Sequence, residues 1–308
     1  MNKYDNIMVS VLMLSYNHER TIARAIEGVI SQKTGYKYEL IIGDDHSPDN
    51  SATIIREYAE KHSDKIVAIC REKNIGAMKN LRDLMNRSRG KYIAVCEGDD
   101  YWIDNLKLEK QISFLEQNTD YCACYTKCKM TVDGKEASYP FANSDSVSVD
   151  DMLNNGEVKR YATCTLVYRN LYRNQPQLLD YFLEGKIGDI IIQTLAVKNG
   201  KIKYLEDVTA VYEKNTLSGS SFSASKLEEQ VLAIRKAINV CKEISGQKYD
   251  IFWNIYMAGF DAEVYWEKKK TGALNAIRWL LHIASLERIA TIRRLIICYI
   301  EAKKKEIS

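Results

Sequence analysis

The stretch Lys91–Trp102 reads K-Y-I-A-V-C-E-G-D-D-Y-W and joins an apolar, strand-like run to a cluster of acids. The run ends abruptly in three carboxylates, Glu97, Asp99 and Asp100. In α/β proteins ligands bind where buried strands end, and neighbouring carboxylates need a reason to coexist. One reason is a divalent cation such as Mg²⁺ or Mn²⁺, which takes oxygen ligands and bridges them to a phosphate. The other is a turn whose acids only cap a helix that begins near Asp104, and the local sequence leaves both open.

Strand-like and helix-like segments alternate over the first 120 residues. The pattern predicts strands over 9–14, 38–42, 65–70 and 92–96, and helices over 19–32, 51–62, 77–88 and 106–117. Nearly continuous apolar strands separated by helices indicate a parallel sheet that is covered on both faces. Further along we expect strands over 121–127, 162–168, 201–205 and 208–213, a helix over 189–198, a loop over 216–225 and helices over 226–244, 250–270 and 273–305.

Composition excludes several classes of protein. The net charge of +3 is too weak to indicate nucleic-acid binding, and no uncharged apolar stretch approaches the ~20 residues of a transmembrane helix. The apolar run 7–14 follows Asp5 and lacks a cleavage site, so it predicts a buried strand and not a signal peptide. Without a secretory signal we expect reduced thiols and a cytoplasmic protein, with Cys122, Cys124 and Cys128 in a core and not on zinc.

The predicted C-terminal helix, 273–305, is basic and amphipathic. One interpretation is a peripheral contact with anionic lipid at the inner face of the cell membrane. The other is a helix that packs on the rest of the chain or on a second subunit in a homodimer, its charges solvated.

Four short motifs follow consecutive predicted strands. They are S-Y-N (15–17), G-D-D-H-S (43–47), K-N-I-G (73–76) and E-G-D-D-Y-W (97–102). The carboxyl ends of parallel strands meet at one edge of a sheet, so we expect these motifs to lie together. Each motif alone is weak, but their order and spacing are specific.

With these motifs the chain resembles family 2 glycosyltransferases of the GT-A fold. The matching segments are V-S-V-L-M-L-S-Y-N, I-I-G-D-D-H-S-P-D-N-S, N-I-G-A-M-K-N and G-K-Y-I-A-V-C-E-G-D-D-Y-W. The resemblance is close over 7–130 and looser over 160–220. It implies a Rossmann-like, mostly parallel sheet flanked by helices in a catalytic domain over 1–222. The nucleotide-binding half would span 1–130, the acceptor half 131–222, and a C-terminal helical region 223–308.

The resemblance implies a nucleotide site at the ends of the first three strands. The chain near Leu14, Ser15, Tyr16 and Asn17 would line the nucleotide pocket. Asp45 would accept a hydrogen bond from the uracil N–H, a charge-assisted bond, while Asp44 supports the turn. The alternative for both is a pair that only stabilises the turn and the next helix.

Two further positions complete the implied donor site. Asn74 and Gly76 would form the loop that closes over the base or ribose, where glycine permits close approach of the backbone. Lys79 stands where many family members carry arginine and could neutralise the diphosphate, although a solvated helix face explains it equally well.

The resemblance implies a D-x-D-type metal site in the fourth motif. Asp99 would contact ribose or sugar, and Asp100 would coordinate Mn²⁺ or Mg²⁺. Glu97 stands where the family has aspartate, which leaves open whether it reaches the metal directly or through water. The cation would neutralise charge that develops on the departing β-phosphate.

Inverting transfer also needs a base for the acceptor hydroxyl. The family places it as the Asp of an E-D pair that opens a helix, and here the segment is G-K-I-G-D-I-I-I-Q, with Asp189 at that position and Gly188 in place of Glu. The alternative for Asp189 is a helix cap. The metal-binding His that often follows Y-R-x is absent from Tyr212–Asn215, whereas His46 is a candidate for the base pocket.

Taken together, these features predict a metal-dependent inverting glycosyltransferase that moves sugar from a UDP-sugar to a glycan acceptor in polysaccharide biosynthesis. The acceptor could be linked to a lipid. A non-catalytic sugar-nucleotide or glycan-binding module of the same fold is the main alternative. A sugar nucleotidyltransferase would need a glycine-rich first loop, and S-Y-N-H-E-R has no glycine. The motif Q-x-x-R-W of processive synthases is absent.

Overall fold

The computed structural model describes residues 6–138, 143–153, 161–184, 187–214 and 227–250, and then 252–254, 256, 257, 260, 261 and 264. Its strands are β1 (Val9–Ser15), β2 (Tyr38–Asp44), β3 (Ile66–Cys70), β4 (Tyr92–Val95), β5 (Tyr101–Trp102), β6 (Tyr121–Val132), β7 (Lys135–Ala137), β8 (Val167–Arg169) and β9 (Lys201–Lys214). Its α-helices are α1 (Ile22–Ile30), α2 (Ser51–Lys61), α3 (Ala77–Arg87), α4 (Lys107–Gln117), α5 (Val149–Met152), α6 (Tyr181–Glu184), α7 (Gly188–Asn199) and α8 (Leu227–Ser245).

All nine strands of the described residues join one mixed sheet in the order β3-β2-β1-β4-β8-β6-β9-β5, with β7 paired to β6. Strands β1 to β4 are parallel, as the alternation of strands and helices predicts. Beyond them β8 runs antiparallel to both β4 and β6. Strands β6 and β9 pair along most of their length, so residues on both sides of position 130 belong to the same sheet.

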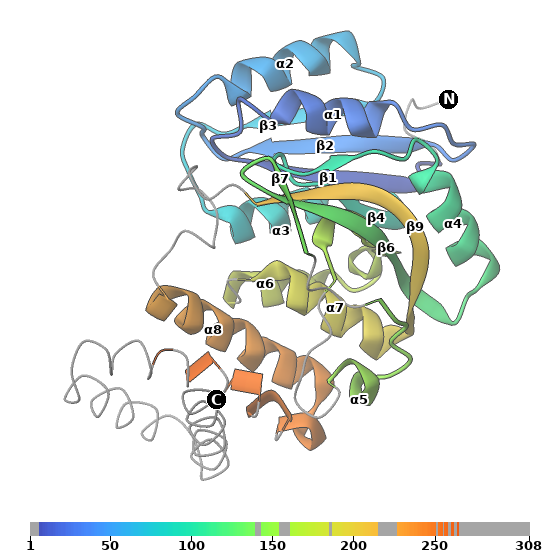
Figure 1. The fold of residues 1–308 in the computed structure, drawn as a ribbon, viewed down its shortest axis with the longest axis vertical. Coiled ribbons are helices and arrows are strands. Elements are labelled where there is room, and N and C mark those ends of the chain that lie inside the picture. The colour runs from blue at the N-terminus through green and yellow to red at the C-terminus, as the bar shows by residue number, and fades with distance from the viewer. Residues whose placement is uncertain are drawn as a thin grey trace.

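Helices cover both faces of this sheet because its strands carry apolar residues in both directions. Along β1, Leu12 packs into one core cluster, while Val11 and Met13 pack into the other. The Leu12 face lies under α3, α6, α7 and α8, and the opposite face lies under α1 and α2 (Figure 1). The predicted parallel sheet with two covered faces is therefore confirmed.

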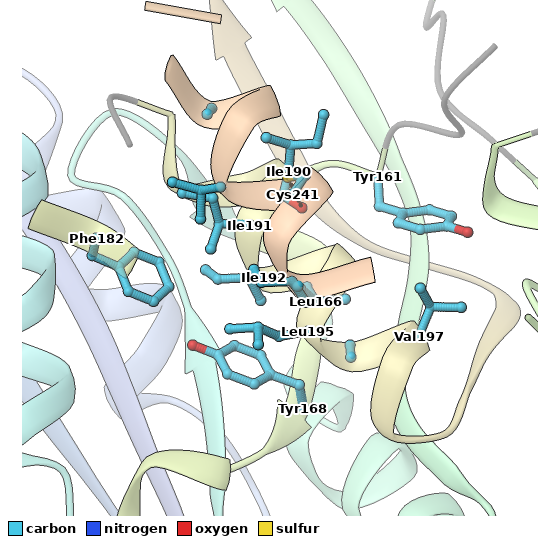
Figure 2. Packing of buried hydrophobic residues seen from close by; sticks show 14 of the residues in the cluster. Tyr161, Leu166, Tyr168, Phe182, Ile190, Ile191, Ile192, Leu195, Val197 and Cys241 are labelled. Carbon is cyan, nitrogen blue, oxygen red and sulfur yellow. Dashed lines mark hydrogen bonds between the residues drawn. The ribbon is translucent and has the colours of Figure 1, made fainter. Parts of the chain in front are cut away.

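Helix α7 is the most deeply placed helix of the site-bearing half. Residues 190–197 are all buried, because α7 packs between the sheet and α8 (Figure 1). Its isoleucines Ile191 and Ile192 meet a cluster that includes Phe182 and Tyr168 (Figure 2). On the α8 side, the Cys241 thiol lies 3.8 Å from the Ile190 carbonyl oxygen. Burial on every face, which here includes Gln193 and Thr194, is typical of such a fully enclosed helix.

Two local predictions are wrong, and one strand was not predicted. The strand expected over 162–168 is instead a 3-10 turn, Thr163–Thr165, followed by the short strand β8. The two strands expected over 201–213 are a single strand, β9, whose pairing with β6 shifts register near Leu205 and Val208. The short strand β5, which pairs antiparallel with β9, has no counterpart among the strands expected from the sequence.

Several predictions fall on residues outside the described part of the chain. They are the loop over 216–225, the domain boundary near 222, and the basic helix over 273–305 with its predicted membrane or subunit contact. The three clustered cysteines, Cys122, Cys124 and Cys128, are buried in the core as expected. Across the described ranges, none of the helices combines the length and the apolar character needed to cross a bilayer.

Candidate active site

The carboxyl ends of the parallel strands open on one cavity of about 480 Å³. The strands share a register that brings Ser15 beside Asp44 and Asp44 beside Cys70, so their following loops converge. The predicted residues that line the cavity are Leu14, Ser15, Tyr16, Asp45, Asn74, Gly76, Glu97, Asp99 and Asp189. The four motifs therefore meet as their spacing predicts, together with the start of α7.

Four of the predicted site residues lie outside this wall. Asn17 adopts a left-handed conformation and donates its backbone N–H to the Ser47 hydroxyl. Asp44 and Asp100 are buried behind the wall, and Lys79 is exposed on α3. Lys79 thus lies on a solvated face of α3, which is the alternative to diphosphate binding that the sequence left open.

Asp45 holds the loop that follows β3. Its Oδ1 accepts the Ile75 N–H and its Oδ2 accepts the Gly76 N–H, each at 2.8 Å. Gly76 has a φ of +89°, a conformation that favours glycine. The Asn74 side-chain oxygen also accepts the Gly76 N–H, at 3.0 Å. The carboxylate of Asp45 therefore fixes the loop that carries Asn74 and Gly76 into the cavity wall.

Asp44 has a different task from its neighbour. Its two oxygens accept the backbone N–H and the hydroxyl of Ser47, at 3.0 and 2.5 Å. These bonds close the turn after β2, as predicted for Asp44. Neither aspartate caps α2, whose N-cap residue is Asn50. Of the alternative roles, stabilising the turn applies to Asp44, and capping α2 applies to neither aspartate.

The acids after β4 do not cap the following helix. The N-cap residue of α4 is Leu106, which has no side-chain cap bond, while the Asp104 carboxylate accepts the Leu106 N–H at 2.9 Å and so stabilises the turn before the helix. Asp100 is 2% exposed, and its Oδ1 accepts the Glu213 N–H at 2.9 Å. Among the described residues its Oδ2 lacks a geometrically sound hydrogen-bond partner, although the Cys164 thiol is near enough to lower the carboxyl pKa slightly. Burial, with the charges of Asp99 and Glu97, nevertheless raises the pKa of Asp100 well above its usual range.

Glu97 lies in the cavity wall between two other acids. Burial raises the pKa of Glu97, and the charges of Asp99 and Asp189 raise it further, to about 8. Glu97 therefore connects the D-x-D-type acids to the start of α7, a proximity that the sequence did not reveal. An arrangement of like charges with this cost is typical of a functional site.

These acids suit a divalent cation only if the substrate supplies the remaining ligands. Within the described ranges, no three histidine, cysteine or acidic side chains converge closely enough to hold an ion by themselves. The buried, unpartnered Oδ2 of Asp100 and the mutually raised pKa values nevertheless mark a place that a cation would stabilise. Mg²⁺ and similar ions are commonly held by one or two carboxylates plus substrate phosphates, which suits this arrangement.

Asp189 occupies the first turn of α7. The helix begins at Gly188, and the Asp189 Oδ1 accepts the Ile190 N–H at 2.7 Å. A carboxylate in the first turn of a helix is favourable, so Asp189 stabilises the start of α7, although the N-cap residue is Ile187. A Cβ at Gly188 would lie 2.8 Å from the Leu81 Cδ2 on α3, so a larger residue there would require the ends of neighbouring side chains to shift.

The sequence analysis missed several wall residues. His18 lines the cavity, with its Nε2 4.0 Å from the Asp99 Oδ2, and Thr163 and Tyr212 line the wall near Asp189. His18 directly follows the S-Y-N motif, and that position was the available signal. The proposed base-pocket histidine, His46, is exposed and is not a wall residue, so that expectation is wrong.

The glycosyl transferase family 2 profile matches residues 10–174, which include all four motifs. The chain belongs to glycosyl transferase family 2. The match ends before Asp189 and α8, so these elements lie beyond the part that defines the family.

Two of three similar curated proteins are named as glycosyltransferases. An uncharacterized protein of Mycobacterium tuberculosis, Rv1520, is 31% identical over 210 residues, covering 67% of this chain and 59% of that protein. The putative glycosyltransferase EpsE of Bacillus subtilis is 41% identical over 37% of this chain and 40% of its own length. WfgD of Escherichia coli, named as a UDP-Glc:α-D-GlcNAc-diphosphoundecaprenol β-1,3-glucosyltransferase, is 36% identical over 37% of this chain and 43% of its own length. The family 2 chain thus spans less than two thirds of the length of these relatives.

Solved structures show that the fold is GT-A. TarS 1–349 of Staphylococcus aureus, in complex with UDP-GlcNAc, superposes with a TM-score of 0.59 at 16% identity, covering 82% of this chain and 71% of TarS. The mannosyltransferase PcManGT of Pyrobaculum calidifontis, in complex with GDP-Man and Mn²⁺, gives 0.58 at 14% identity, covering 97% of this chain and 81% of that one. The predicted fold class is therefore confirmed.

Proposed function

We propose that this family 2 protein transfers a sugar from a UDP-sugar to a hydroxyl group of a glycan acceptor, with inversion and with the help of Mn²⁺ or Mg²⁺. The observation that carries the proposal is the position of Asp189. Its side chain lines the cavity at the strand ends and also lines a second cavity of about 380 Å³ on the side of α8. A base for direct transfer has to stand between donor and acceptor, and the place of Asp189 in the walls of both cavities supports that role.

The first cavity suits the donor. Each carboxylate oxygen has more than one acceptor direction, so Asp45 can hold the loop N–H groups and still accept the uracil N–H. Leu14 and Ser15 would flank the base, and the Asn74–Gly76 loop would close against base or ribose. Asp99 faces the same cavity and would contact the ribose or sugar.

The reaction would be a single displacement. The acceptor oxygen forms a bond to the anomeric carbon while the bond from that carbon to the diphosphate oxygen breaks. The acceptor proton passes to the carboxylate of Asp189. Asp99 and Asp100 would hold the cation, with Glu97 next to them. A bound divalent ion supplies positive charge for the departing diphosphate.

The acceptor class follows from the relatives and stays a proposal. WfgD and WfaP of E. coli are named for transfer to GlcNAc-diphosphoundecaprenol. We propose that the acceptor is a lipid-linked glycan of a surface-polysaccharide pathway. The protein would then act in the cytoplasm, at the inner face of the membrane. A homodimer stays a prediction of the sequence.

A donor screen tests the proposed function. UDP release would be measured with Mn²⁺ across common UDP-sugars, together with UDP binding by isothermal titration. We expect UDP binding and release from at least one donor. Binding without turnover on any donor or acceptor would favour the non-catalytic module, and no UDP binding would contradict the nucleotide site itself.

Asp45→Asn is expected to weaken UDP binding about 10- to 100-fold, equivalent to about 1.4–2.7 kcal/mol. The amide places an NH₂ group against one of two loop N–H donors and cannot accept both bonds. The matched control is Asp49→Asn, because Asp49 also accepts backbone N–H groups, from Glu19 and Ser51, but does not line the cavity. UDP affinity within twofold of the wild type in Asp45→Asn would contradict both roles of Asp45.

Mn²⁺ with UDP is expected to raise the melting temperature more at pH 8 than at pH 6. The raised folded-state pKa of Glu97, about 8 against 4.5 for the free group, means that the metal-free folded protein binds more protons than the unfolded chain between these values. Its stability therefore falls as pH rises through that window, and a cation offsets this loss. Thermal unfolding in EDTA and in Mn²⁺ measures both effects. Glu97→Gln should flatten the metal-free pH dependence, and an unchanged slope would count against the acid cluster.

A further inference from the structure

The second cavity meets the first along a shared wall. Thr163, Ile187, Asp189 and Tyr212 line both cavities. The proposed base thus faces two spaces, and only the first is surrounded by the nucleotide-binding motifs. The second space has no ligand assigned by the motifs of the sequence.

Helices outside the family-defining part build the far wall of the second cavity. Ile234 and Ala237 come from α8, and Tyr256 and Phe260 follow from the next described helical turns. Helix α8 lies directly across α7 (Figure 1), and the Thr194 hydroxyl of α7 lies 3.3 Å from the Cys241 sulfur of α8. The C-terminal helices are therefore part of the wall opposite Asp189.

The side chains in this wall suit a sugar ring better than a charged group. Four aromatic residues contribute, Tyr161, Tyr212, Tyr256 and Phe260. Aromatic faces pack against the C–H faces of pyranose rings, while the amides of Gln193 and Gln230 can bond hydroxyl groups. Among the described lining residues Lys214 is the sole cation, whereas a diphosphate favours several positive charges.

We infer that the second cavity binds the terminal, uncharged sugar ring of the acceptor, and that the C-terminal helices select it. The inference rests on the proposed transfer function and adds the acceptor subsite to it. Its volume of about 380 Å³ is near the lower end of ligand pockets, roughly 300 Å³, which suits one or two rings and excludes a long glycan. The remainder of the acceptor would extend into solvent.

Filling the cavity tests the inference. Ile234→Trp enlarges a half-buried side chain of the far wall that does not line the donor cavity. The matched control is Leu232→Trp on the same helix, since Leu232 is 44% exposed and lines neither cavity. Saturation-transfer NMR would use para-nitrophenyl glycosides of glucose, galactose, GlcNAc and GalNAc on protein loaded with UDP and Mn²⁺.

We expect saturation of the ring protons of at least one glycoside in the wild type and in Leu232→Trp, and at least a fivefold loss in Ile234→Trp. Phe260→Ala should reduce it similarly by removing an aromatic face, and it guards against a folding defect in the larger substitution. UDP affinity within twofold in both variants would show that the donor half is intact.

Two outcomes overturn the inference while the proposed function stands. In the first, the wild type binds UDP but saturates none of the glycosides. In the second, Ile234→Trp and Phe260→Ala bind the glycoside like the wild type. Displacement of the glycoside by inorganic pyrophosphate would also overturn it, because the cavity would then hold the charged part of an acceptor. Failure of the wild type to bind UDP would instead refute the function on which the inference rests.

Discussion

Asp189→Asn is expected to lower kcat for sugar transfer by about 10²- to 10⁴-fold and to leave the affinity for UDP within twofold. Asparagine has the size of aspartate but cannot take up the acceptor proton. Asp189 lines the donor cavity from the start of α7, whereas the loops that would hold the uracil ring follow β1, β2 and β3. The loss should therefore appear in the chemical step and not in nucleotide binding.

This substitution also distinguishes a catalytic base from a residue that only stabilises the start of α7. Asparagine and serine both carry an oxygen that can accept a backbone N–H, so stabilisation of the first turn through the Ile190 N–H can survive in Asp189→Asn and Asp189→Ser. If capping of α7 were the whole role, both variants would keep nearly full activity. If Asp189 is the base, both lose activity while the melting temperature changes little. Single-turnover transfer and thermal unfolding, measured on the same preparations, decide between these roles.

The donor side of the site was predictable because local sequence patterns determine it. Strands β1, β2 and β4 are short apolar runs that each end in a polar motif, as at Ser15 and Asp44. Parallel pairing then brings the motif ends together without any further information. For this reason the positions of Asp45, Gly76 and Asp99 in one wall followed from the sequence.

The antiparallel half resisted prediction because its structure depends on partners far away in sequence. Ala162–Leu166 is apolar enough for a strand, yet Thr163–Thr165 turns, and the Thr165 carbonyl accepts bonds from the buried Lys107 and from Gln111. These two side chains come from α4, more than 50 residues earlier. Tertiary contacts of this kind override local β-propensity.

Within the site, the sequence identified the residues but not the contacts between them. Asp45 was expected to face the base, and its bonds to the loop N–H groups at Ile75 and Gly76 were not visible in the motif. The proximity of Glu97 to Asp189 joins positions about 90 apart, which no local pattern reports. The second cavity depends on α8, which carries no motif.

Arg89→Met is expected to lower the free energy of unfolding by about 3 kcal/mol, without changing UDP affinity by more than twofold. Glu39 is 2% exposed near the start of β2, and it accepts bonds from the Ser10 hydroxyl, at 2.7 Å, and from the backbone and side chain of Arg89. Loss of the guanidinium leaves a buried carboxylate without its counter-charge. Because the Arg89 side chain is 35% exposed, the effect belongs at the lower end of the range of about 3–5 kcal/mol for breaking buried pairs.

The location of this pair makes the prediction specific. Glu39 and Ser10 are the second residues of β2 and β1, at the opposite end of the strands from the cavity, so stability and nucleotide binding should separate. Arg87→Met is the matched control, because Arg87 is 53% exposed and pairs with Asp83 on the surface, and it should cost less than about 0.5 kcal/mol. Glu39→Gln combined with Arg89→Met should recover part of the loss, since the amide oxygen can still accept from Ser10 and no buried charge remains unpaired. Urea unfolding followed by tryptophan fluorescence measures all four proteins. Equal effects of Arg89→Met and Arg87→Met would show that the buried position of Glu39 adds nothing to the pair.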